Sequence, residues 1–422
     1  MSWARDWRRL VGIGVLLAAT GVAAAQRAEK QQIGTDFHVF WQAGSDFAHG
    51  LPLYQPLPGA RTFKFPPFAA QVFQVLGVLP LRLAAGLFYV ASVALALVAA
   101  GITYRVVQRI EPARQHTLVP LLLAFLCSAV FVLDNLVHVQ VNQLTFVLCL
   151  LGIAAFVTGR DVTGAGWLVA ATAIKLTPLF FVIWAVIRGS RRALAGLVGF
   201  GALALALPIA QRGVSQGLLD LTTYYHSFIQ QFASGFVVTN YRNQNLAAMV
   251  YRAVVPRASE DAWPYDYAYL SSLQAAAPLI YRVLALTLLA IFLAYLIRLR
   301  ASGRPVGALE IASVFLVSHL LSGITWKAHL VTLLFVFYVF FRLDVRRMGR
   351  EGRIALGLAW ATIVVIGLGR DLVGSRLHHY LAGYSVFVWA MLFLFALSVV
   401  WSSLPLNPPS ARRSPYSTSG PG

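Results

Sequence analysis

Residues 84–104, AAGLFYVASVALALVAAGITY, contain no charged side chain and are long enough to cross a bilayer as one helix. Apolar runs of similar length recur along the chain, which is 59% hydrophobic and only 12% charged over its 422 residues. Soluble domains contain about 45–50% apolar residues, so lipid has to solvate much of this protein's surface. The runs also lack the alternation that is typical of transmembrane β-strands. The sequence therefore predicts an all-α polytopic membrane protein.

The apolar runs predict about 10–12 transmembrane segments, each close to the length that spans a bilayer. Arginine clusters separate these runs, and the cytoplasmic loops of membrane proteins are enriched in Lys and Arg. With the N-terminus in the cytoplasm, most clusters fall in short cytoplasmic loops, whereas the long loops 26–83 and 212–274 face outward. Topology thus accounts for the net charge of +19, and we expect no nucleic-acid partner. The clearest spans lie at about 9–26, 84–104, 117–133, 142–159, 192–211, 275–297, 306–322, 327–342, 354–370 and 381–401.

One transmembrane domain, 1–403, is expected, followed by a Pro-, Ser- and Arg-rich cytoplasmic tail, 404–422, that is predicted to be disordered. Both outer loops contain helix-like segments. In the first loop, DFHVFWQAGSDFAHG (36–50) predicts an amphipathic helix at the interface, and Pro66 and Pro67 begin a second short apolar helix. We therefore expect both outer loops to be structured elements that pack on the outer membrane face.

The apolar stretch 165–187 is interrupted by KLTP (175–178). It could form a single span, or two half-helices that enter the membrane and return. A single span would place the basic cluster RGSRR (188–192) outside, whereas two half-helices keep that cluster in the cytoplasm. We favour the half-helices for this reason.

Asp36 follows the first apolar run in a chain that has only 15 acidic residues. One interpretation is an N-cap for the helix that is predicted to begin there. The other is a general base at the boundary between membrane and water. A carboxylate in that position can accept the proton of a hydroxyl group as the hydroxyl oxygen attacks.

Lys175 lies inside an apolar stretch, where an ammonium group is costly. Its side chain could snorkel to the interface. Alternatively, it faces a water-filled cavity and pairs with an anion. The break at Pro178 favours the cavity, because broken helices at membrane depth survive where they line a cavity or pack in protein.

Three further polar clusters lie at the outer ends of predicted spans. Each has a structural interpretation, such as helix capping by an amide or a tryptophan of the interfacial belt. As parts of a site, amide side chains would bind sugar hydroxyls and an arginine would bind a phosphate group. The side chains concerned are Gln140 and Asn142, then Arg242, Asn243 and Gln244, and finally Trp326 and His329.

All of these polar side chains fall on the outer side in the same topology, which predicts one outward-facing cavity. A base, cations and amides together suit a reaction between an anionic lipid donor and a hydroxyl acceptor. Nucleotide-activated donors are scarce outside the cytoplasm, so we expect a lipid-linked donor. A transporter or flippase of a polar lipid or sugar would share the broken helix and the cavity. A non-catalytic scaffold would leave the polar clusters without a role.

In order along residues 34–330, the motifs also resemble those of glycosyltransferase family 87, a family of the GT-C superfamily. The matching elements are Asp36, Gly50 and Tyr54, then KFPPFAAQVFQVLGVLPL from Lys64, QVN (140–142), AIKLTPLFF (173–181), RNQN (242–245) and Trp326 with His329. The chain departs from the pattern at Val139, where the family often has Gly, at Asn245, where it often has Ser, and at Lys327 and Ala328. These departures concern the choice of sugar and acceptor more than the reaction class.

The resemblance implies a metal-independent, inverting hexosyltransferase in the cell membrane that uses a polyprenyl-phosphate sugar, typically mannose, and no cofactor. It places the base at Asp36 and the contact with the donor phosphate at Lys175. It adds Tyr54 and Lys64 to the candidate substrate-binding residues. The expected partners are membrane lipids, the lipid-phosphate donor and a lipid- or glycan-linked acceptor of the cell envelope. No paired-carboxylate motif that would hold a metal ion is found in the sequence.

Overall fold

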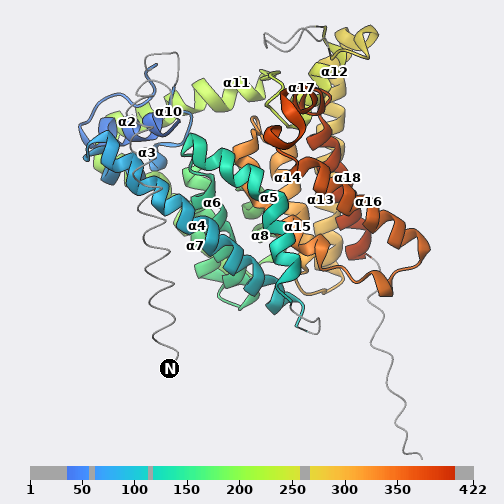
Figure 1. Cartoon of the computed structure of the whole chain (residues 1–422). Helices are drawn as coiled ribbons and strands as arrows, with labels where there is room; N and C mark the ends of the chain where they lie inside the picture. Colours follow the sequence, from blue (N-terminus) through green and yellow to red (C-terminus); the bar gives the residue numbers. More distant parts are fainter. Residues whose placement is uncertain (1–35, 57–61, 113–116, 257–266, 404–422) are drawn as a thin grey trace, which may run out of the picture.

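The computed structural model of the chain describes residues 36–56, 62–112, 117–256 and 267–403. These residues form helices joined by turns, and the described part contains no strand (Figure 1). The prediction of an all-α polytopic membrane protein is confirmed. The expected first span, 9–26, and the tail 404–422 lie outside the described residues.

Many of the helices are short, and several are interrupted by turns, 3-10 segments or π segments. Those that form the body of the protein run roughly along one direction, while α2, α10, α11, α12 and α17 gather at one end of it, the upper end in Figure 1. In chain order the helices are α2 (Asp36–Ala48), α3 (Pro67–Gly77), α4 (Leu81–Ile110), α5 (Val119–His138), α6 (Asn142–Val157), α7 (Asp161–Ile174), α8 (Leu179–Arg188), α9 (Arg191–Arg212), α10 (Val214–Tyr224), the π-helical η1 (Tyr225–Ile229), α11 (Gln230–Ala233), α12 (Leu246–Val254), the 3-10 helix η2 (Ser271–Ala276), α13 (Ala277–Ala301), α14 (Ala308–Leu320), the 3-10 helix η3 (Lys327–Thr332), α15 (Leu333–Phe341), the 3-10 helix η4 (Val345–Arg347), α16 (Arg350–Gly367), α17 (Arg370–Gly383) and α18 (Val386–Ser403).

Four described helices are long and apolar enough to cross a membrane by themselves: α4, α5, α9 and the continuous segment Ser271–Ala301. The bent pair of α16 and residues 372–383 would raise that number to five. The other apolar helices are shorter than the roughly 20 residues that a bilayer requires. Expected spans such as 142–159 and 306–322 therefore correspond to short helices, and the expected total of 10–12 spans stays a prediction.

The segment around KLTP forms two half-helices, as expected. Helix α7 ends at Ile174, α8 begins at Leu179, and the residues between them turn the chain around. The hydroxyl of Ser190, just after α8, donates a hydrogen bond to the carboxylate of Asp161, the first residue of α7. The two ends of the hairpin therefore lie side by side, as two half-helices require, while their place in the membrane stays a prediction.

A second hairpin has the same construction. Helix α14 ends at Leu320, residues 321–326 form a turn, and η3 with α15 returns the chain. The ends of the two hairpins that lie opposite their turns are joined by a buried cluster around Glu310, whose side chain is 1% exposed. Its carboxylate accepts hydrogen bonds from Arg188 Nε at 2.8 Å and from Trp184 Nε1 at 2.7 Å. This cluster fixes the two hairpins against each other, and it thereby also fixes the turns at their opposite ends.

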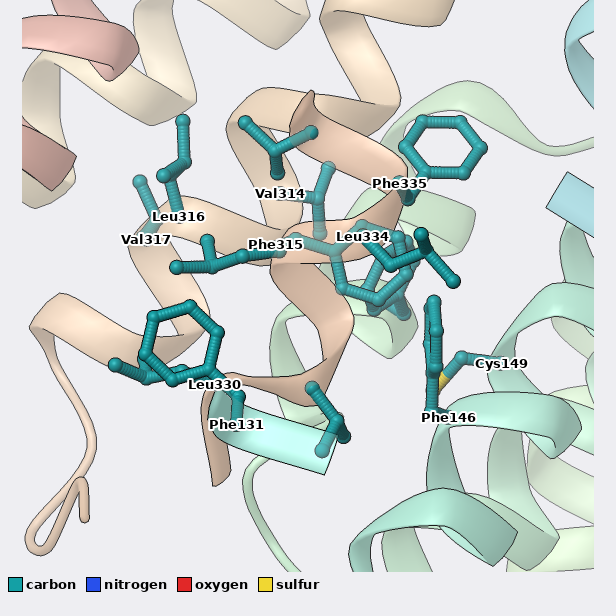
Figure 2. Packing of buried hydrophobic residues seen from close by; sticks show 14 of the residues in the cluster. Phe131, Phe146, Cys149, Val314, Phe315, Leu316, Val317, Leu330, Leu334 and Phe335 are labelled. Atoms are coloured by element: carbon teal, nitrogen blue, oxygen red, sulfur yellow. The ribbon is translucent and has the colours of Figure 1, made fainter. Parts of the chain in front are cut away.

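Between the hairpins and their neighbours lies a packed aromatic core. Phe131 of α5, Phe146 of α6, and Phe315 and Phe335 of the second hairpin are all buried and gather in one cluster (Figure 2). The rings of Phe146 and Phe315 meet edge to face with their centroids 5.5 Å apart. Aromatic pairs of this kind add about 0.5–1.5 kcal/mol beyond simple burial, and here they fix α6 against the second hairpin.

Helix α2 is seated on α3 through two glycines that leave no room for a side chain. A Cβ atom on Gly44 would lie 2.3 Å from the carbonyl oxygen of Phe73, and one on Gly77 would lie 2.2 Å from the amide nitrogen of Ser45. The indole nitrogen of Trp41 also donates a hydrogen bond of 2.9 Å to the carbonyl of Leu79. This contact determines where the first residue of α2, Asp36, can lie.

We expect Gly77→Ala to destabilise the protein and to displace α2, because the added methyl group meets backbone atoms that cannot rotate away. Overpacking of this kind costs about 1–3 kcal/mol, which thermal unfolding of the purified protein would detect. Gly101→Ala is the matched control, since nothing lies within 4 Å of a Cβ at that position of α4. Equal melting temperatures for the two variants would contradict the tight seating of α2 on α3.

Candidate active site

Asp36 and Gln140 are brought together by the start of α2 and by the turn between α5 and α6. Helix α5 ends at His138, and Val139 takes the left-handed conformation with φ 50° and ψ 53°. This conformation is a genuine outlier for a β-branched residue and costs about 1–2 kcal/mol. It turns the chain so that Gln140, which is buried, donates a hydrogen bond from Nε2 to the carboxylate of Asp36.

A chain of side-chain hydrogen bonds continues from Gln140 to Lys175. Asn142 Nδ2 donates to Gln140 Oε1 at 3.1 Å, and Lys175 Nζ donates to Asn142 Oδ1 at 2.5 Å. Lys175 lies at the break between α7 and α8 and is 8% exposed. In every link the donor lies on the side of the ammonium and the acceptor on the side of the carboxylate. The two amides are therefore aligned between the two charges, an arrangement in which neighbouring hydrogen bonds polarise one another.

A cavity of about 560 Å³ opens beside this chain. Its volume is in the range of ligand-binding pockets, about 300–1,000 Å³. Much of the remaining wall is apolar and comes from Leu179 and Phe180 of α8 and from Phe228, Ile229 and Phe232 near η1. The sequence-predicted side chains that line the cavity are Asp36, Lys64, Gln140, Lys175, Arg242, Trp326 and His329.

The second hairpin contributes Trp326 and His329 from its turn and from η3. The ring nitrogen Nδ1 of His329 lies 3.1 Å from the carbonyl oxygen of Ile324, within hydrogen-bonding distance. The backbone nitrogen of Trp326 lies 3.4 Å from the same ring atom. These contacts fix the ring of His329 against the turn, so its orientation at the cavity wall depends on the conformation of residues 321–326.

Asn243 and Gln244 were expected to bind hydroxyl groups, but they do not line the cavity. Both are buried and hydrogen-bonded to backbone. Asn243 Oδ1 accepts from the amide of Thr325 at 2.8 Å, and Gln244 Nε2 donates to the carbonyl of Ala382 at 2.8 Å. Asn245 donates to the carbonyls of Ser322 and Gly323 and caps α12. These amides shape the site by holding the second turn in place.

Of the other sequence-predicted residues, some line the cavity and others contact the residues that line it. Lys64 is exposed and lines the cavity, as does Arg242, whose guanidinium lies over the ring of Tyr241 with 5.6 Å to its centroid. Tyr54 does not line the cavity. Its hydroxyl donates a hydrogen bond of 3.0 Å to the carbonyl of Phe65, a residue that does line it. Asn142 likewise acts behind the wall, through Gln140 and Lys175.

Sequence reasoning missed two polar residues near the site. Asn135 Oδ1 accepts a hydrogen bond of 3.0 Å from Asn142, and Asn135 Nδ2 donates one of 3.3 Å to the carbonyl of Gln140. His319 of α14 is 2% exposed and lies behind Lys175. Both sit inside apolar stretches of sequence, and a polar residue in such a stretch is the signal that could have identified them. Among the described residues, no three His, Cys, Asp or Glu side chains are grouped so that they could hold a metal ion.

Comparison with protein families identifies one match. The model of glycosyltransferase family 87 matches residues 63–323, which is more than half of the chain. The resemblance expected from the sequence motifs is therefore confirmed. Neither the curated proteins nor the solved structures contain a match to the chain. Lys64, Gln140, Lys175 and Arg242 lie within the matched residues, whereas Asp36 precedes them and Trp326 and His329 follow them.

The strained turn at Val139 generates a prediction about stability. At a left-handed position Gly is favoured over Ala, because only residues with a Cβ atom are strained there. We expect Val139→Gly to be more stable than Val139→Ala by about 1 kcal/mol. At Val132, a buried position inside α5, the order should reverse, because Gly in a helix interior is less stable than Ala by about 1 kcal/mol.

Chemical or thermal unfolding of the four purified variants measures both differences. Comparing Gly with Ala at each position cancels the loss of the valine side chain. If Ala were the more stable residue at both positions, the left-handed turn that presents Gln140 to Asp36 would be wrong.

Proposed function

Because the chain belongs to glycosyltransferase family 87, we propose that it transfers a sugar, with mannose as the expected sugar, from a polyprenyl-phosphate donor to a hydroxyl group of a lipid- or glycan-linked acceptor. The observation that carries this proposal is a single cavity in which one carboxylate faces several cationic side chains. Membership in a family of transferases favours this reaction over transport of a polar lipid or sugar, which would use a similar cavity.

In the proposed reaction the acceptor hydroxyl oxygen attacks the anomeric carbon of the donor sugar from the face opposite the phosphate. The new carbon–oxygen bond forms as the bond between the anomeric carbon and the phosphate oxygen breaks. Asp36 accepts the hydroxyl proton, and the bonding electrons leave with the polyprenyl phosphate. A single displacement with one base inverts the anomeric configuration.

Cationic side chains would stabilise the charge that develops on the leaving phosphate. Lys175, Lys64 and Arg242 line the cavity from three separate elements, so they can surround a phosphate group. Lys175 is the best placed of the three, because it is buried and its position is fixed by Asn142. A charge-assisted hydrogen bond in a site shielded from water is stronger than one at the surface. No metal ion or other cofactor takes part in the proposed mechanism.

The lipid part of the donor would lie against the apolar wall between the first hairpin and the segment around η1. Phe180 of α8 and Phe228 and Phe232 of the η1 segment form this wall. In the proposed complex the polyprenyl chain would lie along this wall while the sugar points toward Asp36. Phe228 also packs against Tyr54, with ring centroids 5.7 Å apart, which gives Tyr54 a supporting part in the same surface.

The proposed orientation places the cavity on the extracytoplasmic face of the cell membrane. Arg188 and Arg304 lie together at the end of the hairpins opposite the cavity, where Arg188 donates a hydrogen bond of 2.7 Å to the carbonyl of Arg304. Basic residues are retained on the cytoplasmic side of membrane proteins. The cavity at the other end then faces outward, where a lipid-linked donor and an acceptor of the cell envelope are available.

Replacing the proposed base gives the central test. We expect Asp36→Asn to lower kcat for sugar transfer by about 100-fold or more, because general base catalysis contributes about 10²–10⁴-fold. Transfer from a short-chain polyprenyl-phosphate mannose to a hydroxyl acceptor, followed by mass spectrometry with purified protein, provides the measurement.

Asp46→Asn is the matched control, since Asp46 lies on the same helix but does not line the cavity. Its variant should transfer sugar at close to the wild-type rate. Asp36→Asn with near wild-type turnover would show that another group removes the proton.

Replacing the buried lysine tests the donor site. We expect Lys175→Met to weaken donor affinity by about 10- to 100-fold, since a hydrogen bond to a charged group contributes about 1.5–3 kcal/mol. Lys327→Met is the matched control, because Lys327 precedes the cavity residue His329 in η3 but does not line the cavity. Titration with a short-chain polyprenyl monophosphate measures the affinities. An unchanged affinity in Lys175→Met would restrict this lysine to a structural role.

A further inference from the structure

A second, much smaller chamber lies directly behind the proposed phosphate contact. Its volume is about 30 Å³. The side chains that line both this chamber and the large cavity are Lys175, Thr177, Ser318 and His329, all of them polar. Lys175 therefore faces the large cavity on one side and, on the other, a small space lined by both polar and apolar side chains. The proposed transfer reaction uses only the side of the Lys175 ammonium that faces the large cavity.

His319 closes the far side of the chamber. One ring nitrogen, Nε2, is hydrogen-bonded to the hydroxyl of Thr332 at 2.6 Å. The other, Nδ1, is buried and has no hydrogen-bond partner among the described residues. A buried polar atom that lacks a partner costs about 1–3 kcal/mol, and such atoms in native proteins commonly bind water. The side chain of His319 is only 2% exposed, so bulk solvent does not reach it.

We infer that this chamber is a binding site for one or two ordered water molecules, which bridge His319 Nδ1 and the ammonium of Lys175. A water molecule needs about 10–15 Å³ of cavity volume and two to four polar partners. The chamber provides the volume, and its polar side chains provide the partners. Water can donate to Nδ1 or accept from it, so the bridge forms with either neutral tautomer of the histidine. His319 is thus a positioning residue for Lys175.

The bridge gives the ammonium of Lys175 a second fixed hydrogen bond. Lysine has three N–H donors. One is taken by Asn142 Oδ1, the second points to the chamber water, and the third is left for an anionic group in the large cavity. A flexible lysine side chain loses up to about 2 kcal/mol of rotamer entropy when it is ordered. The contacts with Asn142 and with the chamber water order the Lys175 side chain before the donor binds, so donor binding does not include this loss of entropy. This inference rests on the proposed role of Lys175 at the donor phosphate.

Two isosteric substitutions separate the ring nitrogens of His319. The amide of Asn overlays Nδ1, whereas the amide of Gln overlays Nε2. We expect His319→Gln, which keeps the contact with Thr332 and loses the chamber contact, to weaken binding of a short-chain polyprenyl monophosphate about tenfold, or about 1.4 kcal/mol. His319→Asn should bind within about twofold of wild type. At saturating donor, kcat of His319→Gln should fall as well, because Lys175 also stabilises the charge that develops on the leaving phosphate, whereas kcat of His319→Asn should stay close to wild type.

A third variant fills the chamber without touching His319 or Lys175. Cys149 of α6 lines the chamber and is buried among Phe146 and Phe315 (Figure 2). Cys149→Val adds the volume of a methyl group and should displace water, so it should weaken phosphate binding as His319→Gln does while the melting temperature is retained. Cys127→Val is the matched control, because Cys127 is the other free cysteine and lies outside the chamber.

The water site and the donor site are tested by different outcomes. Weaker binding in His319→Gln and Cys149→Val, with recovery in His319→Asn, supports the water site. Equal binding in the Gln and Asn variants of His319, or wild-type binding in a folded Cys149→Val, overturns it. Lys175→Met is measured in parallel. If it binds the monophosphate as wild type does, the proposed donor site itself is wrong, and the positioning role of His319 is overturned with it.

Discussion

Backbone polar groups that leave a helix inside an apolar fold have to be hydrogen-bonded by the protein, because lipid offers them no partner. The two hairpins meet this constraint at their turns, and both turns contribute residues to the wall of the large cavity. In the second turn, the carbonyls of Ser322 and Gly323 accept from the amide of Asn245, and the backbone of Thr325 pairs with Asn243 and Gln244. The segment 243–245 thus replaces the missing helical partners. Trp326 is the last residue of this turn and His329 lies in η3 just after it, so the hydrogen bonds that hold the turn also determine this part of the cavity wall.

The first turn has a different solution, in which a charge takes part. Lys175 follows the last residue of α7, and its ammonium donates a hydrogen bond to Asn142 rather than directly to Asp36. In a poorly solvated site a lysine and an aspartate would attract each other strongly and could form a direct ion pair. The amides of Gln140 and Asn142 occupy the path between them and are themselves held by Asn135. The carboxylate and the ammonium therefore stay apart, in one cavity, so the proposed base and the proposed phosphate contact can act on different parts of one reaction.

Residues whose chemistry conflicts with their sequence surroundings could be located from the sequence. Lys175 in an apolar stretch, the break at KLTP and the carboxylate of Asp36 all take positions at the cavity, and the half-helices around Lys175 form as expected. The direction of an amide was not predictable, because an Asn in a loop can face a ligand or a backbone group with equal ease. Asn243 and Gln244 face backbone. The number of spans is not settled by the apolar pattern for a related reason. The pattern marks α14 as an apolar helix, but it does not show that this helix ends at Leu320 and is shorter than a bilayer span. His319 could have been noticed as a polar residue in an apolar stretch, but nothing in the sequence indicates the chamber behind Lys175.

The opposite end of the hairpins explains why a site made of turns can be held in place. Glu310, Arg188 and Trp184 form a buried cluster there, and Arg188 and Glu310 both reach backbone groups of the 304–307 segment. A buried ion pair adds little net stability, because the desolvation of both charges offsets their attraction. Its value lies in geometry, since a shift of one hairpin along the other would leave a charge buried without a partner, at a cost of about 3–5 kcal/mol. Because these ends of the two hairpins are held in register, the turns at the opposite ends place Lys175 and His329 at constant positions. The strained turn at Val139 lies beside them and places Gln140 on Asp36, and backbone strain of this kind persists only where the surrounding structure holds it in place.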